Sequence, residues 1–211
     1  MADEPNLKAA YDLSTDDDHR ALYRDWAPGY DTNFARRRGY RLPELAAAAF
    51  LSGMAPDFTD ALDIGAGTGL VAAALPDPVR ARFDALDLSA EMLAEAERQG
   101  LYRAYFAESL FDHAETARGC YDAVVSAGSF TIGHLGPDAL APALSYLRPG
   151  GLYVLTINQA HYRAEDFAAA FAALSDRVTA PTLTDEAIYT QKTGDGHDAD
   201  RAFIATGTAL T

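Results

Sequence analysis

Cysteine is almost absent from this chain of 211 residues, which contains Cys120 alone. A single cysteine offers no disulfide within the chain, and the acidic opening MADEPNLKAAYDLSTDDD has no apolar signal core. We therefore expect a cytoplasmic location. Cys120 precedes an apolar stretch, where packing is a commoner role than nucleophilic catalysis. Apolar runs of the roughly 20 residues that span a bilayer are also missing, so no membrane association is expected.

Positive charge is scarce as well. Lysine and arginine total 17 against 31 acidic residues, which gives a net charge of −14. Nucleic-acid phosphates attract lysine and arginine, so this balance argues against a nucleic-acid partner. One basic cluster, RRRGYR at 36–41, is either a solvated helix face or a contact for an acidic substrate or partner.

Repeats and low-complexity linkers are missing too, so we predict one domain over residues 1–211. Hydrophobic residues make up 49% of the chain, enough for a core. Residues 1–57 are predicted to form a helical cap. The segment 14–27 has Ser14 or Thr15 as N-cap and acids in its first turn, and the segment 41–54 has Pro43 near its start.

Residues 58–211 are predicted to form an α/β core, because short apolar segments alternate with helical ones. Strands are expected at 60–65, 82–88, 102–107, 121–128 and 151–158. Helices are expected at 68–75, 90–99, 137–147 and 164–174, with a weaker one within 111–118. This pattern indicates a parallel sheet with helices on both faces. The tail is predicted to be a β-hairpin of strands 187–193 and 201–210.

A glycine-rich loop follows the first predicted strand, in TDALDIGAGTGLVAAAL at 59–75. It spells GxGxG, and Leu70 stands where the dinucleotide fingerprint requires a third glycine. Asp63 beside the loop disfavours a pyrophosphate and favours a ligand with an ammonium group. Asp87 ends the second strand, where an acid accepts hydrogen bonds from ribose hydroxyls in NAD sites too. Leu88 and Met92 follow and are expected to pack on adenine.

The motifs ALDIGAGTGL, ALDLSAEMLAEAE and LRPGGLYVLT together resemble class I S-adenosylmethionine-dependent methyltransferases. More narrowly, YRDWAPGYD and SAGSFTIGHL are similar to the methyltransferase-like proteins typified by the one from the Williams–Beuren syndrome region. The resemblance implies a Rossmann-like, mostly parallel sheet of seven strands in the order 3-2-1-4-5-7-6, with one antiparallel strand. It also implies S-adenosylmethionine as cofactor and S-adenosylhomocysteine as product.

The resemblance further implies a set of cofactor contacts. Gly65, Ala66 and Gly67 would approach the methionine part, Asp87 would hold the ribose, and Glu108 (or Asp112) with Ser109 would flank the adenine amine. Tyr23 and Tyr30 match a tyrosine pattern that folds over the cofactor, and Ser126 and Gly128 would offer backbone groups. The full predicted cofactor set is Asp63, Gly65, Ala66, Gly67, Gly69, Asp87, Leu88, Met92, Glu108, Ser109, Ser126, Gly128, Tyr23 and Tyr30.

The segment SAGSFTIGH at 126–134 follows the fourth predicted strand, where the reactive methyl group should point. It differs from the Asn-Pro-Pro-Tyr motif of many amine methyltransferases, which counts against methylation of nucleobase amines. His134 is predicted to be a base or a substrate contact, the alternative being a helix cap. Trp26, Phe130 and His161 are the other predicted substrate contacts. The cap aromatics, Tyr11 included, are either core packing or a lid. No metal ligands are predicted.

These observations favour methyl transfer from S-adenosylmethionine to an oxygen or nitrogen of a small molecule by in-line displacement, mainly through positioning. Two alternatives remain open. One is a protein that binds the cofactor without catalysis, as a sensor or partner subunit. The other is an NAD(P)-dependent oxidoreductase, which the missing third glycine makes weaker.

Overall fold

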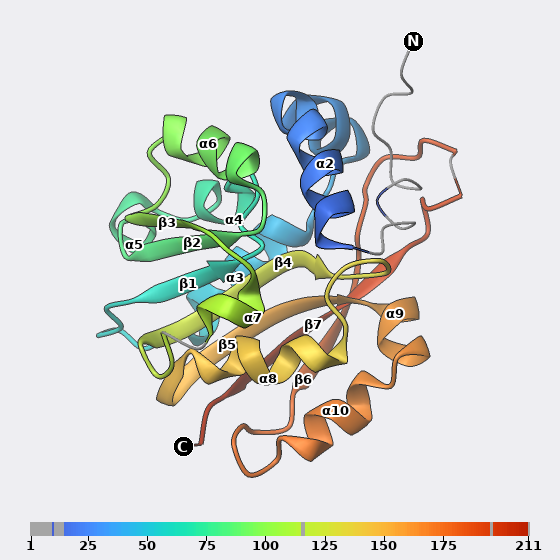
Figure 1. Cartoon of the computed structure of the whole chain (residues 1–211). Coiled ribbons are helices and arrows are strands. Elements are labelled where there is room, and N and C mark those ends of the chain that lie inside the picture. Colours follow the sequence, from blue (N-terminus) through green and yellow to red (C-terminus); the bar gives the residue numbers. More distant parts are fainter. Residues whose placement is uncertain (1–9, 11–14, 115–116, 195, 211) are drawn as a thin grey trace.

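The computed structural model describes residues 10, 15–114, 117–194 and 196–210. One seven-stranded sheet runs through the molecule in the order β3-β2-β1-β4-β5-β7-β6 (Figure 1). Strand β7 is antiparallel to both of its neighbours, and the other pairs are parallel. The predicted fold class and strand order are therefore confirmed. The strands are β1 Ala61–Ile64, β2 Phe83–Asp87, β3 Ala104–Ala107, β4 Tyr121–Phe130, β5 Leu147–Asn158, β6 Thr182–Ala187 and β7 Arg201–Thr208.

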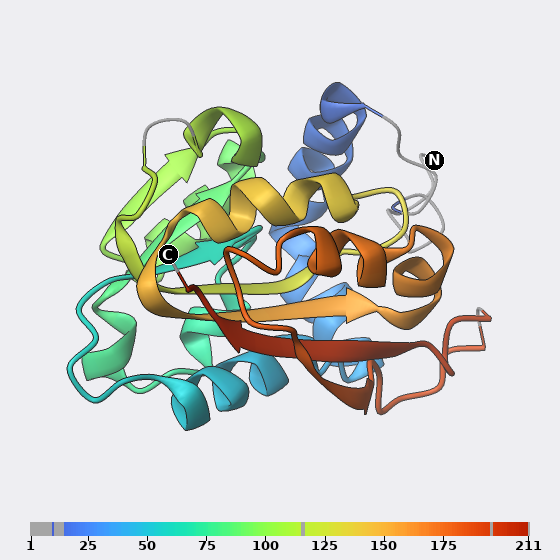
Figure 2. The ribbon, with the colours of Figure 1, turned by 90° about the horizontal axis from the view of Figure 1, so that it is seen from below.

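Helices cover both faces of the sheet (Figures 1 and 2). One face packs against α3 Leu42–Gly53, α4 Leu70–Ala73 and α6 Ala90–Arg98, and the other against α7 Leu110–His113, α8 Leu140–Ser145 and α10 Phe167–Ala173. The central strands are apolar in succession because both of their faces are buried. In β1, for example, Ala61 belongs to one core cluster and Leu62 to the other. Three shorter elements complete this part: α5 Asp77–Arg80, η3 Pro137–Ala139 and α9 Gln159–Ala164.

The predicted cap of residues 1–57 includes α3, which packs on a face of the sheet. The name cap is kept below for the remaining elements: α2 Asp16–Trp26, the 3₁₀ turn η1 Ala27–Gly29 and the π-helix η2 Tyr30–Arg36. Thr15 is the N-cap of α2, since its hydroxyl accepts from the Asp18 backbone N–H. Ser14, the alternative cap, and Tyr11 lie outside the described residues. Trp26 and Phe34 are buried, and their rings pack 5.0 Å apart between centroids, so cap aromatics contribute to the core.

The predicted hairpin was wrong in its first strand. It was placed at 187–193, whereas β6 is Thr182–Ala187 and pairs with Arg201–Thr206 of β7. Most of this edge strand is exposed, so it shows little apolar pattern. The apolar residues Ile188 and Tyr189 that suggested a strand are buried against the cap instead, and Tyr189 forms an isolated bridge with Tyr40.

The predicted helix at 137–147 begins as the 3₁₀ turn η3 and ends at Ser145. Leu147 instead begins strand β5 and pairs with Tyr121 of β4. No helix in the described part of the chain is long and apolar enough to cross a lipid bilayer.

Candidate functional site

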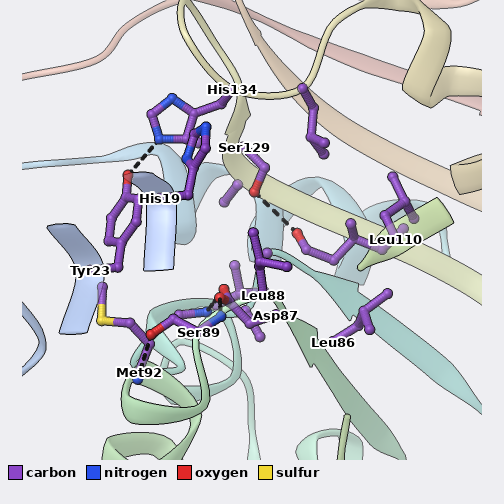
Figure 3. A pocket seen from close by; sticks show the side chains of 18 of the residues that line it. His19, Tyr23, Leu86, Asp87, Leu88, Ser89, Met92, Leu110, Ser129 and His134 are labelled. Atoms are coloured by element: carbon purple, nitrogen blue, oxygen red, sulfur yellow. Dashed lines mark hydrogen bonds between the residues drawn. The ribbon is translucent and has the colours of Figure 1, made fainter. Parts of the chain in front are cut away.

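A cavity of about 280 Å³ lies at the carboxyl ends of β1, β2 and β4, beneath α2 (Figure 3). This is the edge at which open α/β sheets bind ligands. The cavity brings together most of the predicted cofactor residues: Tyr23, Tyr30, Gly65, Ala66, Gly67, Asp87, Leu88, Met92, Glu108, Ser109 and Gly128. Asp63, Gly69 and Ser126 do not line it.

The glycine loop between β1 and α4 forms the floor of this cavity. Gly67 has φ +55°, and a Cβ atom built there would meet no heavy atom within 4 Å. A side chain at this position would therefore project into open space at the cavity wall, and a ligand can approach the backbone closely. Gly69 has another role, since a Cβ there would overlap Leu101 and crowd Ala96, so it allows close packing of the loop on α6.

Asp87 ends β2 and is oriented by the backbone around it. Its Oδ2 accepts from the Gly67 N–H at 2.8 Å, and its Oδ1 accepts from the Ser89 N–H at 2.8 Å. Burial raises the pKa of Asp87, and these two N–H groups oppose that rise. A carboxylate has about four acceptor positions, so each oxygen can still accept from a ligand hydroxyl. The arrangement suits a pair of adjacent hydroxyl groups.

The part of the cavity beyond Asp87 is mostly apolar. Leu88 and Met92, the residues expected to pack on adenine, lie there with Leu86, Leu110 and Phe111. Sequence reasoning missed Leu110 and Phe111, although both directly follow Ser109, the N-cap of α7. Phe111 is 45% exposed, which is unusual for so large an apolar side chain and fits a place at the rim of a ligand site.

Glu108 and Ser109 lie at the same end of the cavity as Leu110. Glu108 is within hydrogen-bond distance of His113, with 3.0 Å between Glu108 Oε2 and His113 Nδ1. The Ser109 hydroxyl accepts from the Phe111 N–H at 3.3 Å, so it holds the start of α7. Asp112, the alternative to Glu108, is exposed and does not line the cavity.

Asp63 lies under the glycine loop, fully buried, and does not reach the cavity. The Tyr102 hydroxyl donates to its Oδ2 at 2.6 Å, while its Oδ1 has no hydrogen-bond partner among the described residues. Burial raises the pKa of Asp63 to about 7. In this structure its direct partner is Tyr102, and Asp63 does not line the cavity in which an ammonium group was expected to meet it.

Ser126 and Gly128 of β4 differ in their exposure to the cavity. Ser126 is fully buried and donates its hydroxyl to the Ile64 carbonyl at 2.7 Å, so it ties β4 to β1. Gly128 lines the cavity, and its N–H donates to Thr156 Oγ1 at 2.8 Å. The neighbouring Ser129, which was not predicted, also lines the cavity.

His134 faces Tyr23 across the top of the cavity, with His19 beside them (Figure 3). Its Nδ1 lies 3.1 Å from the Ile132 carbonyl, which can only accept, so Nδ1 carries the proton. Its Nε2 then accepts from the Tyr23 hydroxyl at 2.7 Å. Burial, with His19 adding to the effect, lowers the pKa of His134 to about 4. The imidazole is therefore neutral at pH 7 and its acceptor nitrogen is engaged.

A second, smaller cavity of about 50 Å³ adjoins the first. Both cavities are lined by Tyr23, Tyr30, Tyr40, Gly128 and His134, so these residues form the junction between them. Trp26 and Phe130, two of the predicted substrate contacts, line the smaller cavity.

His161 lines neither cavity. Its Nε2 lies 3.1 Å from the Leu135 carbonyl, and its ring packs 5.2 Å from that of Phe167. The structure therefore packs His161 against Phe167 and Leu135, outside both cavities.

The cap is joined to the glycine loop by a hydrogen bond that the sequence did not predict. Thr68, in the loop, donates its hydroxyl to Asp31 of η2 at 2.6 Å.

Among the described residues, no group of three or more His, Cys, Asp or Glu side chains is placed to hold a metal ion.

Residues 61–151 match the family model described as a methyltransferase domain. Methyltransferase-like protein 27 from Homo sapiens is 35% identical over 138 residues, which are 64% of this chain and 56% of that protein. The chain thus matches little more than half the length of this relative.

Solved structures share the fold at low sequence identity. The [4+2]-cyclase SpnF has a TM-score of 0.67 at 15% identity, covering 94% of this chain and 98% of its own. A chain of the complex between the Haloferax volcanii Trm112 methyltransferase activator and a putative methyltransferase has a TM-score of 0.60 at 17% identity, covering 90% and 98%. Geranyl diphosphate methyltransferase, solved in complex with GPP and sinefungin, has a TM-score of 0.55 at 16% identity, covering 80% of this chain and 78% of its own. At these identities the likeness shows the fold alone.

Proposed function

We propose that this chain is an S-adenosylmethionine-dependent methyltransferase that acts on an oxygen or nitrogen nucleophile of a small molecule. The observation that carries the proposal is the pairing of Asp87 with the open glycine loop at one edge of the sheet. The carboxylate presents acceptor positions for ribose hydroxyls. Gly67 has no side chain, so a ligand can approach the loop backbone beside the carboxylate. The match of residues 61–151 to a methyltransferase domain supports the same interpretation.

The residues present fit S-adenosylmethionine along the cavity. Asp87 would hold the ribose, and Leu88, Met92 and Leu110 would pack on the adenine. Gly65, Ala66 and Gly67 would approach the methionine part. Tyr23 and Tyr30 would cover the ligand from the cap, exclude water and present electron-rich rings to a sulfonium centre. When bound, the cofactor supplies an activated methyl group.

The protein's contribution to the reaction is chiefly positioning. The nucleophile must lie close to the methyl group and opposite the departing sulfur, which can supply most of the rate enhancement. His134 is poorly suited to act as a general base, because its Nε2 already accepts a hydrogen bond from Tyr23 and its pKa is lowered to about 4. We assign the Tyr23–His134 pair to orienting the acceptor at the junction of the two cavities.

The narrower resemblance, to methyltransferase-like proteins, bears on the acceptor only weakly. Geranyl diphosphate methyltransferase, a neighbour in fold, was solved with a small molecule, which is consistent with a small-molecule acceptor. Another neighbour was solved with a protein activator. We propose a small-molecule acceptor for this chain, with the cofactor site complete within one chain.

Titration calorimetry tests the cofactor directly. The purified chain is titrated with S-adenosylmethionine, S-adenosylhomocysteine and NADH. We expect saturable binding of the first two and none of NADH. Binding of NADH with no response to S-adenosylmethionine up to millimolar concentration would overturn the proposal in favour of an oxidoreductase.

A second experiment separates an enzyme from a protein that binds the cofactor without turnover. The chain is incubated with a cell extract and S-adenosylmethionine labelled in its methyl group, and labelled products are identified by mass spectrometry. An enzyme transfers label to a small molecule. Tight binding without labelled product in any metabolite pool supports the non-catalytic alternative. This experiment is needed because a protein with the same fold is a [4+2]-cyclase, so the fold alone does not establish methyl transfer.

A further inference from the structure

The smaller cavity beside the cofactor site is walled mainly by rings, as far as the described residues show. Its described lining includes no Asp, Glu, Lys or Arg residue, and His134 is neutral at pH 7. The Arg38 guanidinium packs on the Tyr189 ring, 4.3 Å from its centroid, and Arg38 does not line the cavity. Transfer of an anionic ligand group into such surroundings would be costly without a partner. The rings can attract a cation, but an ammonium group also needs hydrogen-bond acceptors, and the polar side chains described below offer donors.

Two polar side chains of β5 also line this cavity. Thr156 and Asn158 are two residues apart, so they point to the same face of the strand. They are 1% and 4% exposed. Both are therefore deeply buried in the wall of the smaller cavity.

The orientation of the Asn158 amide follows from its contacts. Its Oδ1 accepts from the backbone N–H groups of Ala160 and His161 at 2.9 and 3.1 Å, which makes Asn158 the N-cap of α9. The amide nitrogen must then be the group that the side chain offers elsewhere, and no described residue accepts a hydrogen bond from it. Two N–H donors are thus left in a buried, cavity-lining side chain, where unsatisfied polar groups are uncommon.

Thr156 also has a donor that no described residue uses. Its Oγ1 accepts from the Gly128 N–H at 2.8 Å, and its hydroxyl hydrogen has no acceptor among the described residues. One face of β5 therefore presents hydroxyl and amide donors to the cavity together. Such a pair matches a ligand atom that accepts two hydrogen bonds, such as a carbonyl, ether or hydroxyl oxygen.

We propose that Thr156 and Asn158 form a two-donor site that holds an oxygen atom of an uncharged, mainly apolar acceptor molecule in the smaller cavity. The inference rests on the proposed methyltransferase function and specifies its acceptor. The apolar body of the acceptor packs on Trp26 and Phe130, and its reacting atom lies at the junction formed by Tyr23 and His134. Asn158 is a specificity residue here, since it selects oxygen-bearing neutral molecules.

Trp26 supplies a readout that needs no turnover, because it is the single tryptophan of the chain and lines this cavity. The chain, saturated with S-adenosylhomocysteine, is titrated with cyclohexanol while tryptophan fluorescence is recorded. Cyclohexanecarboxylate and cyclohexylammonium serve as charged probes of similar size. We expect a saturable change with cyclohexanol, and at least tenfold weaker responses with both charged probes. Equal binding of a charged probe would overturn the assignment of an uncharged acceptor.

Two variants test Asn158 without removing the helix cap. Asn158→Ser and Asn158→Asp both keep an oxygen that can cap α9, and both lose the amide N–H donors. We expect each to weaken cyclohexanol binding about tenfold while calorimetry shows unchanged affinity for S-adenosylhomocysteine. The serine variant introduces no charge, so it remains informative if the aspartate variant folds poorly. Because the serine hydroxyl can itself donate one hydrogen bond, the two variants are read together, and unchanged cyclohexanol affinity in both Asn158→Ser and Asn158→Asp would show that Asn158 is only a cap.

The two proposals fail in different ways. If S-adenosylhomocysteine does not bind the wild-type chain, the cofactor proposal fails. If it binds and cyclohexanol produces no saturable change, the cofactor proposal stands and the two-donor site is overturned.

Discussion

At the scale of single residues, the cofactor site depends on a carboxylate that the backbone holds in place. Asp87 accepts from two loop N–H groups that approach it from either side, Gly67 and Ser89. These bonds offset part of the cost of burying the charge and fix the direction of the remaining acceptor positions. Without these hydrogen bonds, burial would favour the protonated carboxyl, which has fewer acceptor positions than the carboxylate.

Replacement of Asp87 tests this role. In Asp87→Ala we expect affinity for S-adenosylhomocysteine to fall at least tenfold, since a hydrogen bond to a charged group contributes about 1.5–3 kcal/mol. Titration calorimetry measures the change. Asp112→Ala is the matched control, because Asp112 is exposed, lies outside the cavity and was the alternative acid near this end of the site. A similar loss in both variants would show that Asp87 has no special contact.

Gly67 allows a second test, with a control that has the same backbone conformation. Gly67 and Gly100 have φ +55° and +62°, and a Cβ at either meets nothing within 4 Å. Alanine at either position should therefore cost about 1 kcal/mol in the free energy of unfolding through backbone strain. Only Gly67→Ala should also lower affinity for S-adenosylhomocysteine, by tenfold or more, because Gly67 lines the cavity. Equal affinities in the two variants would show that no ligand approaches Gly67.

At the scale of elements, polar contacts hold the cap over the cavity. Tyr23 of α2 donates to His134 of the loop after β4, and Asp31 of η2 accepts from Thr68 of the glycine loop. These contacts join the cap to the two loops that surround the ligand site. The cap and the site are therefore expected to order together when ligand binds.

The Thr68–Asp31 contact can be removed with little change in shape. Thr68→Val should lower the free energy of unfolding by about 1–2 kcal/mol, since a hydrogen bond to a carboxylate is lost. We also expect faster hydrogen exchange of η2 amides and several-fold weaker binding of S-adenosylhomocysteine. Thr32→Val is the control, as Thr32 lies on the same π-helix with an exposed side chain. If η2 exchange is unchanged in Thr68→Val, this contact does not hold the cap.

At the scale of the whole molecule, stability depends on pH through a buried acid. The pKa of Asp63 is raised by burial to about 7, above the value near 4 of an unfolded chain. Between these values the folded state binds a proton that the unfolded state does not, so the free energy of unfolding falls as pH rises from about 4 to 7. Above pH 7 the whole penalty of a buried, charged carboxylate is present.

Asp63→Asn removes this titration and keeps an oxygen that can accept from Tyr102. We expect the variant to gain stability relative to wild type by about 2 kcal/mol between pH 5 and pH 7, as each pKa unit corresponds to about 1.4 kcal/mol. Urea denaturation at the two pH values measures the difference. A constant difference between wild type and variant would show that Asp63 does not titrate in this range.

The predictions made from the sequence succeeded where local pattern and packing agree. The strand order is confirmed, and five predicted strands lie close to β1–β5. The first hairpin strand was misplaced because β6 is an exposed edge, where pairing rather than apolar burial makes the strand. The π-helix η2 was missed, since no residue spacing in YDTNFAR distinguishes it from an α-helix.

The sequence by itself determined the glycine loop, the acid that ends β2 and the alternation that makes a buried parallel sheet. These features depend on neighbours along the chain, through backbone conformation and strand periodicity. Only the tertiary structure decided that Asp63 lies below the loop, that His134 pairs with Tyr23, and that Thr156 and Asn158 meet the cap aromatics in a second cavity. Such contacts join residues far apart in the chain, and their geometry follows from how α2, β4 and β5 pack together.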